Sequence, residues 1–139
     1  YPDGGQQIQA STSTLVDFVF TLSGFNDGNH FDYSFPNHYL VPYDGVYQFN
    51  TNVTINLPVG VQWIVEIWVD DNVSGAIPVV SNASSPVDFL LEHSGTVSAT
   101  LKLKQNSKVY AVVEQRDQTT PHNLSTNSTA TWFSGHRLY

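Results

Sequence analysis

Residues 46–57 alternate strictly between two kinds of side chain. The odd positions are mostly apolar or aromatic, and the even positions after Val46 are amides or hydroxyls. The odd set is Tyr47, Phe49, Thr51, Val53, Ile55 and Leu57. A period of two predicts a β-strand with one face buried and the other in water. The run exceeds the usual strand length of about five or six residues, so we expect it to cross the whole body of the fold.

A turn precedes this strand at Pro42-Tyr43-Asp44-Gly45. Proline fixes the backbone at one turn position. We expect Gly45 to supply a backbone angle that other residues reach only with strain.

Shorter runs of the same alternation follow along the chain. They predict strands within residues 14–22, 61–69, 87–91, 97–103, 109–115 and 129–138, with short pieces near 31–35 and 77–80. No window of helical length shows helical periodicity. The sequence therefore predicts an all-β fold of about ten antiparallel strands, a sandwich or a jelly roll.

The strand predicted at residues 61–69 carries large apolar side chains on both faces. Its second face carries Ile64 and Trp68, whereas a strand on a one-sided sheet exposes polar groups there. We expect this strand to be covered on both sides or to meet another subunit, because a lone domain would leave both side chains exposed.

Three motifs in order resemble one family. They are Gly45-Val46-Tyr47-Gln48-Phe49, Ser94-Gly95-Thr96-Val97 and Trp132-Phe133-Ser134-Gly135-His136-Arg137-Leu138, preceded by Phe20, Asn26, Phe31 and Tyr39 at nearly the family spacing. Residues 14–139 thus resemble the globular head domain of complement C1q, which shares a jelly-roll fold with the tumour necrosis factor cytokines. The chain departs from that family at Thr51, where an aromatic is usual, and at 104–108, where a Gly-Asp turn is usual.

The resemblance implies a ten-stranded antiparallel jelly-roll β-sandwich that assembles as a homotrimer on a stalk. Residues 1–13 would connect the head to a missing stalk, and residues 14–139 would form the head. Side chains expected in the core or along the threefold axis are Tyr47, Phe49, Ile64, Trp68, Trp132 and Phe133.

The amino-acid composition excludes several kinds of binding partner and of stabilising site. The 139 residues suffice for one domain with its own core, and the absence of cysteine excludes disulfides and thiolate metal sites. A formal charge of -7 argues against nucleic acid and anionic membranes, although Lys102, Lys104 and Lys108 cluster in one segment. No apolar run is long enough to insert in a membrane.

We expect an extracellular protein, secreted or on a cell, spore or virion surface. Only 12% of the residues are charged, while serine, threonine and asparagine are abundant, as in many extracellular β-proteins. The chain starts at Tyr1 without methionine and is interpreted as a piece of a longer protein. Five sequons begin at Asn52, Asn72, Asn82, Asn123 and Asn127, and a chain of this composition also forms sequons by chance.

Signals for catalysis and for metal binding are weak. The five histidines lie in separate predicted loops or strand ends, and no nucleophile or phosphate-binding motif occurs, so we expect no enzyme and no required cofactor. Calcium is possible at Asp70 and Asp71, because hard cations take several loop oxygens. The family's own calcium site lacks its expected Asp near Leu91, and a solvated turn is the favoured interpretation of the Asp pair.

The predicted function is a trimeric, non-enzymatic recognition or adhesion head that binds a cell-surface glycan or protein through tip loops and clefts between subunits. Ligand-binding candidates from the predicted loops are Asn26, Asp27, His30, Asn82, His122 and Asn123. One alternative is a monomeric carbohydrate-binding β-sandwich, which would expose a line of Trp or Tyr. Another is a purely structural trimerisation cap.

Overall fold

The computed structural model describes residues 6–10, 13–15, 30–32, 37–84, 91–117, 119–125 and 131–139. Within these ranges all regular elements are β-strands. The described residues contain no helix that is long and apolar enough to cross a membrane. The strands are β1 (Gln7–Ile8), β2 (Ser13–Leu15), β3 (Phe31–Asp32), β4 (His38–Leu40), β5 (Gly45–Leu57), β6 (Trp63–Asp70), β7 (Ala76–Ala83), β8 (Leu91–Leu103), β9 (Lys108–Gln115), β10 (His122–Asn123) and β11 (Trp132–Arg137).

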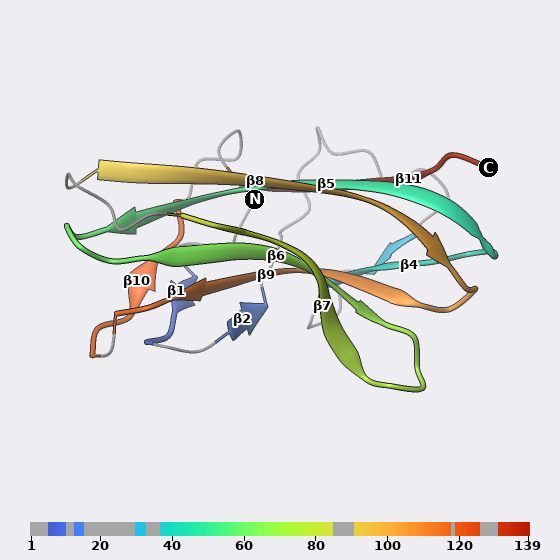
Figure 1. Ribbon diagram of the computed structural model, residues 1–139, viewed down its shortest axis with the longest axis horizontal. Coiled ribbons are helices and arrows are strands. Elements are labelled where there is room, and N and C mark those ends of the chain that lie inside the picture. Colours follow the sequence, from blue (N-terminus) through green and yellow to red (C-terminus); the bar gives the residue numbers. More distant parts are fainter. Residues whose placement is uncertain are drawn as a thin grey trace.

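Two sheets pack face to face (Figure 1). The first has the order β11-β5-β8, and the second has the order β3-β4-β9-β6-β7, with β2 also paired to β9. All strand pairs within these sheets are antiparallel. The predicted all-β antiparallel sandwich is confirmed.

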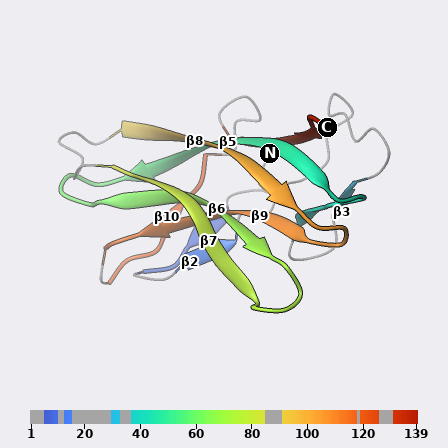
Figure 2. The same cartoon turned by 45° about the vertical axis from the view of Figure 1, so that its right-hand side comes forward.

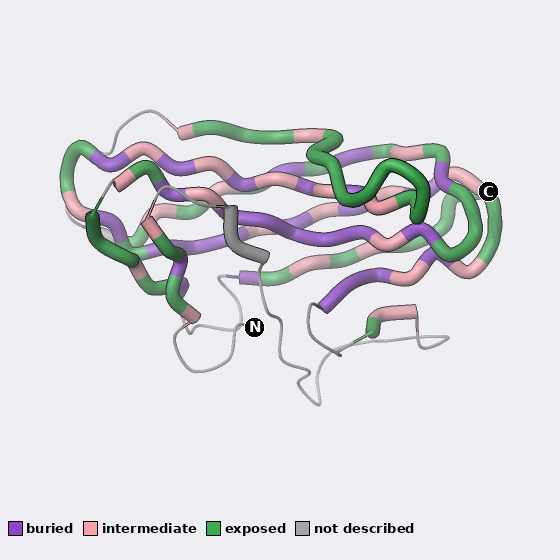
Figure 3. The backbone as a smooth tube through the Cα atoms, turned by 90° about the horizontal axis from the view of Figure 1, so that it is seen from below, coloured by how far each residue is buried: buried purple, intermediate pink, exposed green. Residues whose placement is uncertain are grey.

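Strand β5 is the centre of the first sheet. It pairs with β8 over its full length of 13 residues, from Gly45 opposite Leu103 to Leu57 opposite Leu91. From Tyr47 to Val53 its buried and half-buried residues alternate, as the period-two pattern predicts, whereas Thr54 is buried as well. Figure 3 shows such alternation of buried and half-buried positions along strands of the sandwich. On its other edge β5 pairs with β11.

Aromatic rings fill the space between the sheets. Tyr47 and Phe49 are fully buried on β5, and their ring centroids lie 6.2 Å apart. Phe133 on β11 stacks on Phe49 at 5.8 Å, and Tyr39 on β4 meets Phe49 edge-on at 5.2 Å. Aromatic pairs at these separations add stabilisation beyond the area they bury.

Two glycines of the family motifs make room for this layer. A Cβ on Gly135 would lie 2.4 Å from Cε1 of Phe49, and a Cβ on Gly95 would lie 2.7 Å from Cη2 of Trp63. Gly45 also serves close approach, because its Cβ would lie 2.7 Å from Nε of Arg137. The expected special backbone angle at Gly45 is wrong, since the positive φ values among described glycines occur at Gly60 and Gly75.

Thr51 stands where an aromatic residue is usual in the family, and its buried hydroxyl has a hydrogen-bond partner. Its side chain is fully buried, and its hydroxyl donates to the carbonyl oxygen of Trp132 at 2.8 Å. A buried hydroxyl is tolerated when it is bonded in this way. The substitution therefore joins β5 to β11.

Some strand boundaries differ from the prediction. β8 is one continuous strand through Gly95, where the sequence suggested a break, and β7 extends the short apolar piece at 77–80 to eight residues. The loop after β9 contains the short strand β10. The hairpin of β6 and β7 projects from the sandwich (Figures 1 and 2).

Part of the predicted connector contributes to the core. Ile8 on β1 is fully buried, and β1 pairs with β10. A stalk beyond this segment stays a prediction. Of the strand expected at 14–22, only residues 14 and 15 lie within the described ranges.

We predict that Gly135→Ala lowers the free energy of unfolding by about 1–3 kcal/mol, because the new methyl group collides with the buried ring of Phe49. Urea unfolding measures the change. The exposed neighbour Ser134 provides the control, and Ser134→Ala should stay within about 0.5 kcal/mol of the parent. Equal effects of the two substitutions would contradict the packing role of Gly135.

Candidate recognition surfaces

The outward face of the first sheet carries rows of uncharged polar side chains, here called the polar ladder. Its members on β5 and β8 are Gln48, Asn50, Asn52, Thr54, Ser94, Thr96, Ser98 and Thr100. Thr96 Oγ1 donates to Asn52 Oδ1 at 2.7 Å, and Ser98 Oγ donates to Asn50 Oδ1 at 2.8 Å. Thr100 bonds to Gln48 in the same way, and the hydroxyls of Thr54 and Ser94 are 2.6 Å apart.

Register explains why these groups meet. Gln48, Asn50 and Asn52 of β5 each lie directly opposite a hydroxyl of β8, at the cross-strand spacing where side chains interact, and beyond them Asn56 lies opposite Glu92. β11 extends the rows with Trp132 opposite Asn52, Ser134 opposite Asn50 and His136 opposite Gln48. The middle of the face is therefore an ordered, uncharged surface that offers hydroxyl oxygens and amide N–H groups, with Glu92 and Lys102 at its two ends.

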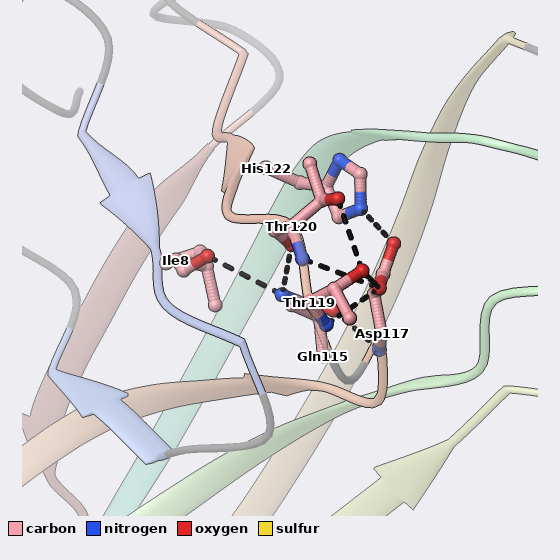
Figure 4. Close-up of polar contacts among 6 residues, drawn as sticks. All are labelled: Ile8, Gln115, Asp117, Thr119, Thr120 and His122. Carbon is pink, nitrogen blue, oxygen red and sulfur yellow. Dashed lines mark hydrogen bonds and ion pairs between the residues drawn. The ribbon is translucent and has the colours of Figure 1, made fainter.

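A second polar cluster orders the loop between β9 and β10 (Figure 4). The Asp117 carboxylate accepts the backbone N–H of Thr119 at 3.0 Å and that of Thr120 at 3.3 Å. Its other oxygen lies 3.0 Å from Nε2 of His122, on β10. Because an ionised carboxylate can only accept, Nε2 carries the proton in this contact.

Gln115 links this loop to the N-terminal strand. Its amide is fully buried at the end of β9 and donates to the carbonyl of Thr120 at 2.9 Å and, at 3.5 Å, to that of Ile8. Its oxygen accepts the backbone N–H of Asp117 at 2.6 Å. The loop and β1 are thus held by one side chain (Figure 4).

The predicted calcium ligands shape the β6–β7 turn. Asp70 Oδ1 accepts the backbone N–H of Asn72, and Asp71 Oδ1 accepts those of Val73 and Ser74. Hydrogen bonds from Ser74 and Val73 hold the pKa of Asp71 below its ordinary value. The described residues contain no group of three or more His, Cys, Asp or Glu side chains that could hold a metal ion, and calcium at this turn stays a prediction.

The residues expected in the core or at the axis fall into two groups. Tyr47, Phe49 and Phe133 belong to the buried aromatic layer or pack against it. Ile64 and Trp68 are half-buried on the outward face of β6, where Trp68 Nε1 donates to Glu66 at 2.7 Å. Trp132, at the edge of the polar ladder, is 39% exposed.

The ligand candidates that the structure describes do not form one site. Asn82 Nδ2 donates to the carbonyl of Thr96 at 2.8 Å and so joins the edges of the two sheets. His122 binds Asp117, and its exposed neighbour Asn123 pairs with Gln7 across β1 and β10. The ring of His30 contacts that of Tyr39. Asn26 and Asp27 lie outside the described residues.

Sequence reasoning missed two of these arrangements. The even positions of residues 46–57 were identified as a wet face, but their pairing with β8 needs the register of two strands far apart in sequence. The bonds of Gln115 were equally hidden, because they join residues up to 107 positions apart. The turn at Asp117 was easier to predict from the sequence, since Asp side chains often form such local hydrogen bonds to the backbone.

Comparisons with known proteins identify the fold. The chain resembles the solved structure of Eiger TNF from S. frugiperda with a TM-score of 0.58 and 17% identity, over 74% of this chain and 65% of that chain. It thus spans less than two thirds of that structure. No protein-family model and no curated protein matches. The predicted C1q/TNF-like jelly roll is confirmed as the fold.

We predict that Asp117→Asn lowers the melting temperature at neutral pH but not near pH 2. Hydrogen bonds from Thr119 and His122 hold the pKa of Asp117 at about 2, below the ordinary 3.8. A carboxyl with a depressed pKa stabilises the fold above its unfolded pKa and loses that contribution as pH falls through its folded pKa. Melting curves of parent and variant between pH 2 and pH 7 should converge at the acidic end. A constant difference would contradict the ionic role.

Proposed function

We propose that this chain is a homotrimeric, non-enzymatic recognition head, an extracellular ligand domain of the TNF/C1q type. Support comes from the fold, because the similar solved structure is that of a TNF. Its specific role, adhesion at the tip of a stalk or fibre to a glycan or surface protein, is part of the proposal. One fold can have many functions, so evidence for assembly and binding has to come from a surface of this chain.

The polar ladder is the observation that best supports assembly into a trimer. Each copy bears a formal charge of -7, so copies repel one another except through uncharged surfaces. The eight ladder residues include no carboxylate, although Glu92 follows at one end of the same face, and their amides and hydroxyls are already held in place by bonds between β5 and β8. An ordered polar surface loses little side-chain entropy when a second copy covers it. We therefore place the contact between copies on this face.

A closed trimer would give the head its binding strength. Cyclic symmetry presents three equivalent ligand sites, and simultaneous contacts multiply weak single affinities. The ligand loops would lie at the two ends of the sandwich, where side-chain bonds to the backbone order the turns at Asp71 and Asp117. Ordered loops bind at lower entropic cost.

One observation favours a second candidate, a monomeric carbohydrate-binding sandwich. Trp132 is 39% exposed beside the amides and hydroxyls of the ladder. An exposed indole next to directional polar groups suits the stacking of a sugar ring. In that case the ladder would face a glycan instead of a second copy.

Light scattering on residues 1–139 distinguishes the two. We predict a mass near three times 15.4 kDa, and a monomer for Ser98→Arg, because a guanidinium in the centre of the ladder would be buried without a counter-charge. Ser81→Arg is the control, since Ser81 is exposed on the outward face of the other sheet, opposite Glu66.

A monomeric parent would refute the trimer and support the sugar-binding sandwich. A trimer that survives Ser98→Arg but not Ser81→Arg would move the contact to the second sheet. Melting temperatures of both variants exclude loss of mass through unfolding.

A further inference from the structure

A compact cluster of exposed side chains lies where the chain enters β5. It consists of Tyr43, Asp44, Lys102, Lys104, Arg137, Leu138 and Tyr139, and we call it the entry-turn surface. The C-terminal residues lie directly against the turn, because the backbone N–H of Val46 donates to the carbonyl of Tyr139 at 2.9 Å. Gly45 permits this approach, since a Cβ there would lie 2.8 Å from that same oxygen.

Arg137 is held in position at this surface. Its guanidinium donates to the backbone carbonyl of Asp44 at 3.0 Å and lies 5.9 Å from the centre of the Tyr43 ring. The carbonyl of Tyr43 in turn accepts the buried Tyr47 hydroxyl at 2.7 Å. The arginine and the tyrosine ring are thus ordered without a bound partner, which lowers the cost of binding one.

The cations of this acidic chain gather around the same turn. Lys104 Nζ lies 2.9 Å from the Asp44 carboxylate, and hydrogen bonds from Gln105 and Lys104, with the charges of Lys104 and Lys102, lower the pKa of Asp44. Arg116, at the opposite end of β9, pairs with Glu114. Across the described ranges, Lys102 and Arg137 make no ion pair with any carboxylate, although acids outnumber bases by 12 to 5.

Large apolar and aromatic surfaces lie exposed beside these cations. Tyr43 is 62% exposed, Leu138 is 47% exposed and Tyr139 is 77% exposed. Tyrosine and arginine are the residue types that most often dominate binding energy, because each combines large contact area with polar contacts. The cluster thus combines flat rings with unpaired positive charge.

We propose that the entry-turn surface binds an acidic sugar, a pyranose ring that carries a carboxylate or a sulfate. An exposed tyrosine ring stacks on the apolar face of a pyranose, and the guanidinium of Arg137 donates paired hydrogen bonds to the anionic group. Lys102 adds attraction at the edge. A nucleic acid is a poor fit, because its long phosphate backbone would meet the negative field of the rest of the chain.

This inference rests on the proposed recognition function and names its ligand, but it does not depend on the trimer. All its residues belong to one copy. A monomer that binds acidic sugar would refute the assembly and keep the site, whereas a trimer that does not bind would refute the site alone.

The test is titration of the full chain, whose mass is measured in the same buffer, with sialyllactose, sulfated lactose and neutral lactose. Chemical shift changes of backbone amides give the affinities and locate the site. We expect both acidic sugars to shift residues 43–46 and 137–139, lactose to bind about ten-fold more weakly, and added salt to weaken only the acidic sugars.

Variants assign the contact. Arg137→Gln should weaken sialyllactose about ten-fold while Arg137→Lys retains part of the affinity, and Tyr43→Ala should weaken all three sugars. Arg116→Gln is the matched control, since it removes the other arginine far from this turn, and should change nothing. Melting temperatures identify any variant that fails to fold.

Three results would overturn the proposal. They are equal affinity for lactose and sialyllactose, shifts located elsewhere in the sheet, and equal losses from Arg137→Gln and Arg116→Gln. Binding of an acidic peptide in place of every sugar would likewise refute the sugar and leave a protein-binding surface.

Discussion

The alternation of β5 is the constraint on which the rest of the structure depends. One face of this strand must be shielded from water. Its rings, Tyr47 and Phe49, pack with Tyr39 of β4 and Phe133 of β11 to form the aromatic layer. The other face must be polar, because it points away from the second sheet. A shift of register by one residue would exchange the two faces, so the pairing of β5 with β8 and β11 is strongly specified.

This division also separates the side chains that pack the core from those that face outward. Buried positions of β5 are occupied by rings and aliphatic groups, and the opposite positions present amides and hydroxyls in register with β8. At the strand ends, carboxylates such as Asp44, Asp71 and Asp117 bind backbone N–H groups and give the loops defined shapes. Surfaces of both kinds are ordered by bonds within the chain, which is a property that the proposed recognition function requires.

The fold was largely predictable, and the sites were not. Period-two patterning located β5, β6 and β9, and the motifs around Gly95 and Gly135 suggested the jelly roll because glycine is needed where Trp63 and Phe49 lie. The predicted strand boundaries were wrong where local sequence signals were weak, as in β8 and β7. The residues of the proposed binding surfaces were harder to predict, since contacts such as Arg137 with Tyr43 join positions that only the fold brings together.

The closing strand has a consequence for how the protein is made. β11 bonds to β5 across 81 positions of sequence, for example from Thr51 to the carbonyl of Trp132. During synthesis, β5 therefore leaves the ribosome long before the strand that covers one of its edges. Folds rich in such distant pairings form slowly, because loop closure must come before the contacts that stabilise it. An open strand edge is a template for pairing with another chain, so the nascent chain has to keep this edge of β5 from pairing elsewhere until β11 has been made.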